Sequence, residues 1–184
     1  MKPYVFNVAQ ITDSCIKWIQ EWMSKNGNDS TKVVIGISGG KDSTVVAALC
    51  AKAIGKERIL GVMMPNGVQP DISDSQKIVD FLQIPHITIN INNAYNGLTE
   101  EIKSKLDLES LSPQYLTNTP ARLRMTTLYG VGAIIGNARV VNTCNRSEDV
   151  QGYSTHYGDS AGDFAPVAKL TTEEVVAMGD YLGL

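Results

Sequence analysis

Apolar residues along the chain switch between two spacings, and the switch recurs several times. Short runs rich in Val and Ile occupy 33–37, 59–64, 87–91 and 139–143. Runs of this length and composition predict β-strands, and an uninterrupted apolar run predicts a strand that is buried on both faces. Segments of helical periodicity separate the runs, so the pattern predicts strands that alternate with helices.

The segments between the strands repeat their apolar residues at helical spacing. The helices predicted in this way cover 11–22, 45–53, 71–82, 98–106 and a segment that starts at Pro120 and carries Leu123, Leu128 and Val131. A capping box, Thr171-Thr172-Glu173-Glu174, opens a last helix. Two polar stretches, 108–118 and 152–166, are predicted as loops.

Strands that alternate with helices of this length make βαβ units, which build a parallel sheet through right-handed crossovers. We therefore predict an α/β fold with one parallel sheet flanked by helices. The 184 residues fit a single domain over 1–184, which includes an N-terminal helical segment within 1–30. The apolar stripe around Trp18 and Trp22 in that segment is interpreted as a packing surface, with a dimer contact as the alternative.

Charge and cysteine content exclude several classes of protein. The net charge is −3 and no cluster of Lys and Arg occurs, so non-specific binding to nucleic acid is not favoured. The three cysteines form no CxxC pair, which argues against a disulfide framework or a zinc site. No apolar run approaches the roughly 20 residues of a membrane span, and no signal peptide fits the first residues. We expect a cytoplasmic protein without a membrane segment.

A glycine-rich turn, Ser38-Gly39-Gly40-Lys41-Asp42-Ser43, joins the first predicted strand to its helix. Adjacent glycines let backbone N–H groups approach an anion, and the helix N-terminus behind them adds a partial positive charge. The turn is not a Walker A loop, because three residues separate Gly36 from Gly40 and Asp42 stands between the lysine and the serine. A kinase or a GTPase is therefore disfavoured.

Asp42 places a carboxylate inside this anion-binding turn. It would repel phosphate unless a cation lay between them, so Asp42 is a natural Mg²⁺ ligand. The turn resembles the SGGxDS loop of the ATP-pyrophosphatases (PP-loop enzymes), which implies an adenine nucleotide alpha hydrolase-like fold. Those enzymes cleave ATP between its α- and β-phosphates. The resemblance assigns ATP contacts to Gly36, Ile37, Ser38, Gly39, Gly40, Lys41, Asp42 and Ser43.

Further motifs narrow the resemblance to one family. In chain order they are Pro65-Asn66-Gly67-Val68-Gln69, Ala121-Arg122-Leu123-Arg124-Met125, Asn142-Thr143-Cys144-Asn145-Arg146-Ser147-Glu148 and Gly152-Tyr153-Ser154-Thr155-His156-Tyr157-Gly158-Asp159, followed by Asp163. This ordered set resembles the ammonia-dependent NAD synthetases over about 33–182. The resemblance implies that Glu148 binds Mg²⁺ together with Asp42, and that Thr143 and Gln69 lie against ATP.

The same resemblance assigns substrate contacts to Arg122, His156 and Asp163, which would bind deamido-NAD. Arg122 and Arg124 are two residues apart on a predicted helix, about 200° around its axis, so at most one of them is expected to enter the site. His156 replaces a lysine that many relatives carry, and it supplies less positive charge near pH 7. Thr172 also stands where a lysine that touches ATP is common.

The implied reaction is the amidation of the nicotinate carboxylate of deamido-NAD, with ATP as co-substrate and Mg²⁺ as cofactor. A C–N bond forms through an adenylylated intermediate, and AMP and pyrophosphate are released. No residue is expected to act as a covalent catalyst, because positioning and charge neutralisation by the metal carry the reaction. We expect free ammonia, or a separate glutaminase, to supply the nitrogen.

Two alternatives remain open from the sequence. One is another adenylylating PP-loop ligase, such as a tRNA-modifying or GMP-synthetase-like enzyme, although basic patches and cysteine pairs are missing. The other is a non-catalytic ATP-binding homologue, because NAD synthetases continue past the position of Leu184 and this chain is expected to lack that segment. Membership of the family would also imply a homodimer.

Overall fold

The computed structural model describes residues 5–68 and 72–184. Its helices are α1 (Val8–Asn26), α2 (Lys41–Ile54), α3 (Ile72–Leu82), α4 (Asn92–Leu106), α5 (Pro113–Ile135), α6 (Arg146–Gln151) and α7 (Thr172–Leu182), with a short 3₁₀ turn η1 (Lys56–Arg58). Its strands are β1 (Lys32–Gly36), β2 (Ile59–Met63), β3 (His86–Thr88) and β4 (Ala138–Val140). Strands and helices alternate along the first part of the chain, as the apolar pattern predicts.

The four strands form one parallel sheet in the order β3-β2-β1-β4. Val34 in the central strand β1 lies opposite Leu60 on one side and opposite Val140 on the other. The predicted α/β fold with a parallel sheet is confirmed. The chain runs outward from β1 through β2 to β3 and then returns to the opposite side of β1, so the strand order reverses between β1 and β4. Ligands of open α/β sheets bind at such a switch point.

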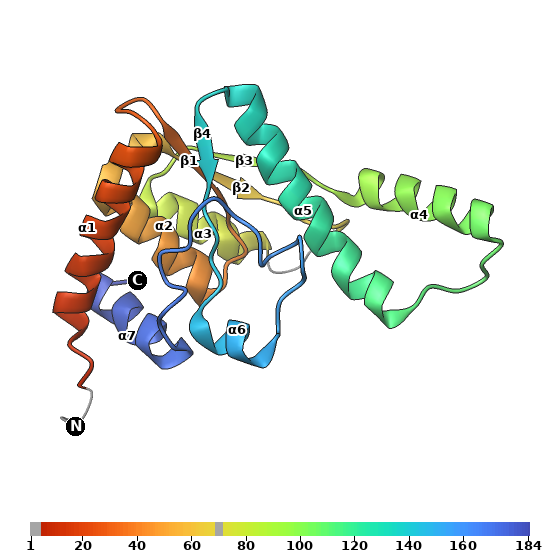
Figure 1. Cartoon of the computed structure of the whole chain (residues 1–184). Coiled ribbons are helices and arrows are strands. Elements are labelled where there is room, and N and C mark those ends of the chain that lie inside the picture. Colours follow the sequence, from red (N-terminus) through yellow and green to blue (C-terminus); the bar gives the residue numbers. More distant parts are fainter. Residues whose placement is uncertain (1–4, 69–71) are drawn as a thin grey trace.

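Helices cover both faces of the sheet (Figure 1). α2 and α3 pack on one face, α1 and α7 pack outside α2, and α5 crosses the other face against β1 and β4. Val33 and Ile35 belong to the core on the α2 side, whereas Val34 belongs to the core on the α5 side. Since successive side chains of a strand point to opposite faces, β1 is buried on both, which explains its uninterrupted apolar run.

The N-terminal tryptophans pack against a segment from the far end of the chain. Trp22 stacks on Phe164 with ring centroids 4.4 Å apart, and Trp18 lies 6.3 Å from the same ring. Ile19, on the same helical stripe, is fully buried. The interpretation of this stripe as a packing surface therefore agrees with the structure, and only Trp18, 41% exposed, keeps much of its surface in solvent.

The predicted loop over 108–118 is wrong in its second half, because α5 begins at Pro113. The side chain of Ser112 caps the helix by accepting a hydrogen bond from the backbone N–H of Tyr115. Pro113 suits the first helical position, where the missing N–H would have no partner. Pro120, predicted as the helix start, lies inside the helix instead.

Other differences concern the ends of elements. β4 ends at Val140 rather than 143. Beyond it, the Val141 backbone N–H still donates to the Val34 carbonyl of β1 (3.1 Å), and Val141 forms an isolated parallel bridge with Phe164. α4 begins at Asn92, six residues before the predicted start. The capping box at Thr171 and Glu174 is confirmed at the start of α7. Among the helices in the described residues, none has the length and apolarity that a membrane crossing requires.

Candidate nucleotide-binding site

The glycine-rich turn forms a compact loop between β1 and α2. The Ser38 hydroxyl accepts a hydrogen bond from the Gly40 backbone N–H (3.2 Å) and lies 3.1 Å from the Ser43 hydroxyl. The Ser43 hydroxyl donates to the Gly40 carbonyl (3.0 Å). Gly40 caps α2 without a side-chain hydrogen bond, so the first N–H groups of the helix have no capping side chain. Such groups at a helix N-terminus bind anions.

Gly39 has a positive φ of 80°, which side chains other than glycine rarely adopt. A Cβ atom at this position would lie 3.1 Å from the Ser75 backbone nitrogen and 3.1 Å from the Asp74 Cβ. The loop is therefore seated directly on the first turns of α3. Both the backbone angle and the close packing require glycine at this position.

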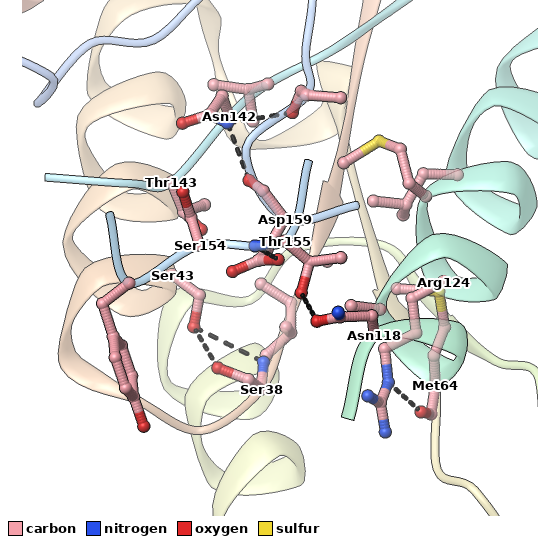
Figure 2. Close-up of a pocket in the computed structure, with 18 of the residues that line it drawn as sticks. Ser38, Ser43, Met64, Asn118, Arg124, Asn142, Thr143, Ser154, Thr155 and Asp159 are labelled. Carbon is pink, nitrogen blue, oxygen red and sulfur yellow. Dashed lines mark hydrogen bonds between the residues drawn. The ribbon is translucent and has the colours of Figure 1, made fainter. Parts of the chain in front are cut away.

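A cavity of about 680 Å³ opens beside this loop, at the carboxyl ends of β1 and β4. Figure 2 shows its polar side, with Ser38 and Ser43 facing Thr143, Ser154 and Thr155. Its opposite side is more apolar and comes from Met64, just after β2, and from Met125 and Leu128 of α5. A volume of this size, mostly apolar with a few convergent polar groups, is typical of a small-molecule site.

The loop after β4 supplies the second wall of the cavity. The Asn142 amide donates to the carbonyls of Asp159 (2.8 Å) and Ala161 (2.9 Å), and its side-chain oxygen accepts from the Cys144 backbone N–H (2.8 Å). The Thr155 hydroxyl donates to the Asn118 side chain of α5 (3.0 Å). These contacts, several of them drawn in Figure 2, fix the 152–166 loop to the segment after β4 and to α5.

Two carboxylates predicted to share a metal lie beside the same buried residue. The side chain of Asn145 donates to Asp42 Oδ1 (3.0 Å), and the Asn145 backbone N–H donates to Glu148 Oε2 (3.1 Å). Asp42 Oδ2 also accepts a charged hydrogen bond from Lys41 Nζ at 2.7 Å. Within residues 5–68 and 72–184, no three His, Cys, Asp or Glu side chains form a potential metal cluster. A cation here would need ligand oxygens in addition to the two carboxylates.

The predicted substrate residues Arg122, His156 and Asp163 are exposed and lie outside the lining of the cavity. Arg122 Nε donates to the backbone carbonyl of His156 (3.1 Å), so these two are brought together. Asp163 instead accepts hydrogen bonds from the Tyr129 hydroxyl (3.2 Å) and the Val140 backbone N–H (2.7 Å). Arg122 and Tyr129 are seven residues apart on α5 and share one face, with roughly 10 Å between them.

Burial changes the acid–base properties of several groups around the site. Burial lowers the pKa of Arg124, which lines the cavity and donates through Nε to the Met64 carbonyl (2.9 Å). The pKa of Tyr129 is raised by burial first and then by the neighbouring Asp163 carboxylate. Burial and the nearby carboxylates raise the pKa of Cys144 to about 12, so this thiol is not a nucleophile at neutral pH.

Sequence reasoning missed several residues of the cavity. Asn118 falls within the predicted loop but lies on α5, and Arg124 rather than Arg122 lines the cavity. The 200° separation of the two arginines indicates that only one of them enters the site, but not which one. Asn145 belongs to the quoted motif after β4, yet its buried position between two carboxylates follows only from the fold. The predicted ATP contact Gln69 lies outside the described residues.

The fold and the site together define a nucleotide-binding α/β domain of the PP-loop type. The family model described as NAD synthase matches residues 11–184. The chain therefore belongs to the NAD synthase family.

Individual relatives agree with this assignment. An NH(3)-dependent NAD(+) synthetase of Pyrococcus horikoshii is 38% identical over 172 residues, which cover 94% of this chain and 64% of that protein. The chain thus spans less than two thirds of that relative's length. The structure of an NH3-dependent NAD synthetase from Campylobacter jejuni superposes with a TM-score of 0.86 at 32% identity, covering 98% of this chain and 75% of the other. An NMN synthetase from Francisella tularensis superposes with a TM-score of 0.85 at 30% identity, covering 97% and 72%.

Proposed function

We propose that this chain is a ligase that converts deamido-NAD to NAD with ammonia, with ATP as co-substrate, and that it needs Mg²⁺. The observation that carries the proposal is the SGGKDS loop at the N-terminus of α2, where Asp42 and Glu148 both bond to Asn145 beside the cavity. A phosphate loop that contains a carboxylate suits a nucleotide that arrives with a metal ion. Membership of the NAD synthase family supports the choice of reaction.

We propose one orientation for ATP in the cavity. Its phosphates would lie on the backbone of 38–40 and at the N-terminus of α2, where the helix offers partial positive charge. Its adenosine would then lie between Thr143 and the apolar wall that includes Met64 and Leu128.

The residues present fit Mg²⁺. Mg²⁺ prefers octahedral oxygen ligands and is usually held by one or two carboxylates, phosphate oxygens and water. Asp42 and Glu148 supply the two carboxylates, and both are only partly exposed at the same edge of the sheet. When bound there, the ion would neutralise charge on the phosphates as pyrophosphate departs.

Deamido-NAD would lie outside the ATP cavity, along the exposed face of α5. Arg122, held against the backbone of His156, offers a cation at one end of this face. Tyr129, bonded to Asp163, offers an aromatic ring and a carboxylate roughly 10 Å further along the helix. A dinucleotide is long enough to contact both ends, and an anionic one is favoured near the arginine.

The proposed chemistry has two balanced steps. An oxygen of the nicotinate carboxylate attacks the α-phosphorus of ATP, the bond to the bridging oxygen of the β-phosphate breaks, and pyrophosphate leaves. Ammonia then attacks the carbonyl carbon of the acyl adenylate, loses one proton, and expels AMP. The loop backbone, Ser38 and Ser43 hold the departing phosphates, so the residues contribute positioning and charge stabilisation rather than a nucleophile.

We propose that free ammonia is the nitrogen source, with a separate glutaminase as the alternative supplier. The named relatives that support this are NH(3)-dependent enzymes. We also place the protein in the cytoplasm, which agrees with its three free cysteines.

We further propose that the protein forms a homodimer, and that the arm made by α4 and the first half of α5 supplies the contact. Figure 1 shows this arm extending away from the sheet. It exposes Leu98, Leu106, Leu108 and Leu116, each more than 40% accessible. The stripe at Trp18 and Trp22, considered for this role from the sequence, is mostly covered by its own chain. Sedimentation of wild type and of Leu106→Asp/Leu116→Asp tests the contact, since only the latter should sediment as a monomer.

Product analysis tests the proposed reaction and its substrates. Purified protein is incubated with ATP, Mg²⁺ and ¹⁵N-labelled ammonium, with either deamido-NAD or nicotinate mononucleotide, and the amide products are quantified by mass spectrometry. We expect labelled NAD from deamido-NAD and much less product from the mononucleotide or from glutamine. Preferential amidation of the mononucleotide would replace the proposed substrate, and equal use of glutamine would refute the ammonia source.

A further inference from the structure

Asn145 occupies an unusual position between the two carboxylates of the proposed metal site. It is fully buried, and it lies between the end of β4 and the start of α6. Its side-chain oxygen accepts a hydrogen bond from the Glu148 backbone N–H (3.1 Å), and its own backbone N–H donates to Glu148 Oε2 (3.1 Å). These two bonds form a reciprocal capping box at the start of α6.

The side-chain nitrogen of Asn145 makes a different contact. It donates to Asp42 Oδ1 at 3.0 Å, which links the first turn of α2 to the first turn of α6. The Asn145 side chain therefore orients Asp42 directly through its nitrogen. Through its oxygen it caps α6, and this cap positions Glu148. Helix capping alone would not need this nitrogen, because Ser, Thr or Asp can also supply a capping oxygen.

The two partners of the Asp42 carboxylate differ in charge and in exposure. Lys41 binds Oδ2 as a cation at 2.7 Å, and its side chain is 40% exposed. Asn145 binds Oδ1 as a neutral donor and is fully buried. A metal ion competes with a lysine ammonium for the same negative charge, whereas a neutral amide fixes the carboxylate without reducing that charge.

We propose that Asn145 is a positioning residue that holds the Asp42 and Glu148 carboxylates in the arrangement required to bind one divalent cation. The proposal rests on the metal site of the proposed function. Groups that orient metal ligands typically affect metal affinity by about 10–100-fold when they are removed. The loss of the Asn145 amide should therefore weaken metal binding more than nucleotide binding.

The variant Asn145→Ser removes the side-chain amide but keeps a side chain that can cap α6. Serine is as good a capping residue as asparagine, but its side chain is too short to reach Asp42 and carries no amide. Asn145→Thr fills more of the buried volume and replaces the serine variant if that variant does not fold. The matched control is Asn137→Ser, because the Asn137 side chain also links separate segments, through Asn28, Ser30 and Thr31, but just before β4, at the opposite edge of the sheet.

Mn²⁺ is the probe, since it accepts the same oxygen ligands as Mg²⁺ and its free concentration can be counted by electron paramagnetic resonance. Each protein is titrated with Mn²⁺ in the presence of a non-hydrolysable ATP analogue, and analogue binding is measured separately in EDTA. Circular dichroism and thermal unfolding establish that each variant is folded. We expect about a tenfold weaker Mn²⁺ affinity for Asn145→Ser, analogue binding in EDTA within about twofold of wild type, and wild-type Mn²⁺ affinity for Asn137→Ser.

Equal Mn²⁺ affinity of folded Asn145→Ser and wild type would overturn the proposal and leave the proposed metal site standing. Equal losses of Mn²⁺ affinity in Asn145→Ser and Asn137→Ser would also overturn it, because the weaker binding would then result from reduced stability of the fold. A wild-type protein that binds no Mn²⁺ with the analogue would overturn both the role of Asn145 and the metal site. Amidation of deamido-NAD by the wild type is measured independently, so a failure of the proposed reaction is distinguished from a failure of Asn145.

Discussion

At the scale of single residues, Gly39 shows how closely the phosphate loop is constrained. Its φ of 80° and the 3.1 Å approach of a Cβ to the Ser75 nitrogen are independent reasons for glycine. Gly136, at the end of α5, has a similar φ of 83°, but the space that a Cβ would occupy there is open. Alanine substitutions at these two glycines therefore separate the effect of backbone strain, which both share, from the effect of displacing the loop, which only Gly39 would show.

We predict that Gly39→Ala and Gly136→Ala each lower the free energy of unfolding by about 1 kcal/mol, because alanine disfavours a positive φ. Only Gly39→Ala should also weaken binding of a fluorescent ATP analogue, by about tenfold or more, since its methyl group pushes the loop away from α3. Urea denaturation and analogue titration measure the two effects. Similar analogue affinity in both variants would mean that the loop tolerates the displacement.

The buried thiol of Cys50 gives a prediction for alkaline pH. Burial raises its pKa from an ordinary value of 9.0 to about 12. A pKa that is raised in the folded state stabilises the fold below pH 9 and loses this contribution as the pH rises toward 12, because the unfolded thiol ionises first.

Between pH 8 and pH 10, this thiol should reduce the free energy of unfolding by about 1 kcal/mol. In Cys50→Ala, the loss over the same range should be smaller by that amount, although the variant is less stable at every pH because of the cavity. Urea denaturation of both proteins at the two pH values measures the difference. Parallel pH dependences would contradict a raised Cys50 pKa.

Much of the candidate site could be predicted residue by residue because its motifs are contiguous. The loop from Ser38 to Ser43 contains its own glycines, hydroxyls and carboxylate, so its chemistry is local in the sequence. Arg124, Thr155 and Asn145 take their places only through contacts between distant segments. A sequence pattern can indicate that such polar residues are important, but not which partner each one meets.

At the scale of elements, strand and helix order follows from periodicity, whereas helix ends follow from caps. The sequence predicts that α5 starts at Pro120, because a proline inside a helix is costly, and this start is wrong. The structure tolerates Pro120 within the helix, where Ser112 and Pro113 already make a favourable start. The neighbouring residue Thr119 is buried, and Tyr115 bonds to Thr99 of α4, so tertiary contacts favour the longer helix.

Replacement of the cap tests this assignment. Ser112→Ala should lower protection of backbone amides at 114–119 from hydrogen exchange and reduce stability by about 1 kcal/mol, because the first turn of α5 loses its cap. Ser110→Ala is the matched control, since Ser110 is exposed and precedes the helix. If amides 114–119 exchanged freely even in the wild type, α5 would begin near Pro120 after all.

At the scale of the whole molecule, the order of the strands explains why the site lies where it does. Because β1 is flanked by β2 and β4, the loops after β1 and β4 meet at one edge of the sheet. The glycine-rich loop lies in the first of them, and the motifs from Asn142 to Asp159 lie in the segment after β4. This placement was predictable from the parallel sheet alone. The arm formed by α4 and the first half of α5 could not be predicted, because its exposed leucines follow the same helical spacing as leucines that are buried in a core.

We propose that the chain cleaves ATP between its α- and β-phosphates in response to deamido-NAD. ³¹P NMR of a reaction with ATP, Mg²⁺ and ammonium measures this directly, with and without deamido-NAD and with Asp42→Ala as the control. We expect AMP and pyrophosphate in a one-to-one ratio, only when deamido-NAD is present, and a rate of AMP formation that is about 100-fold or more lower in the folded Asp42→Ala variant. Formation of ADP and phosphate, or AMP formation that does not depend on deamido-NAD, would contradict it.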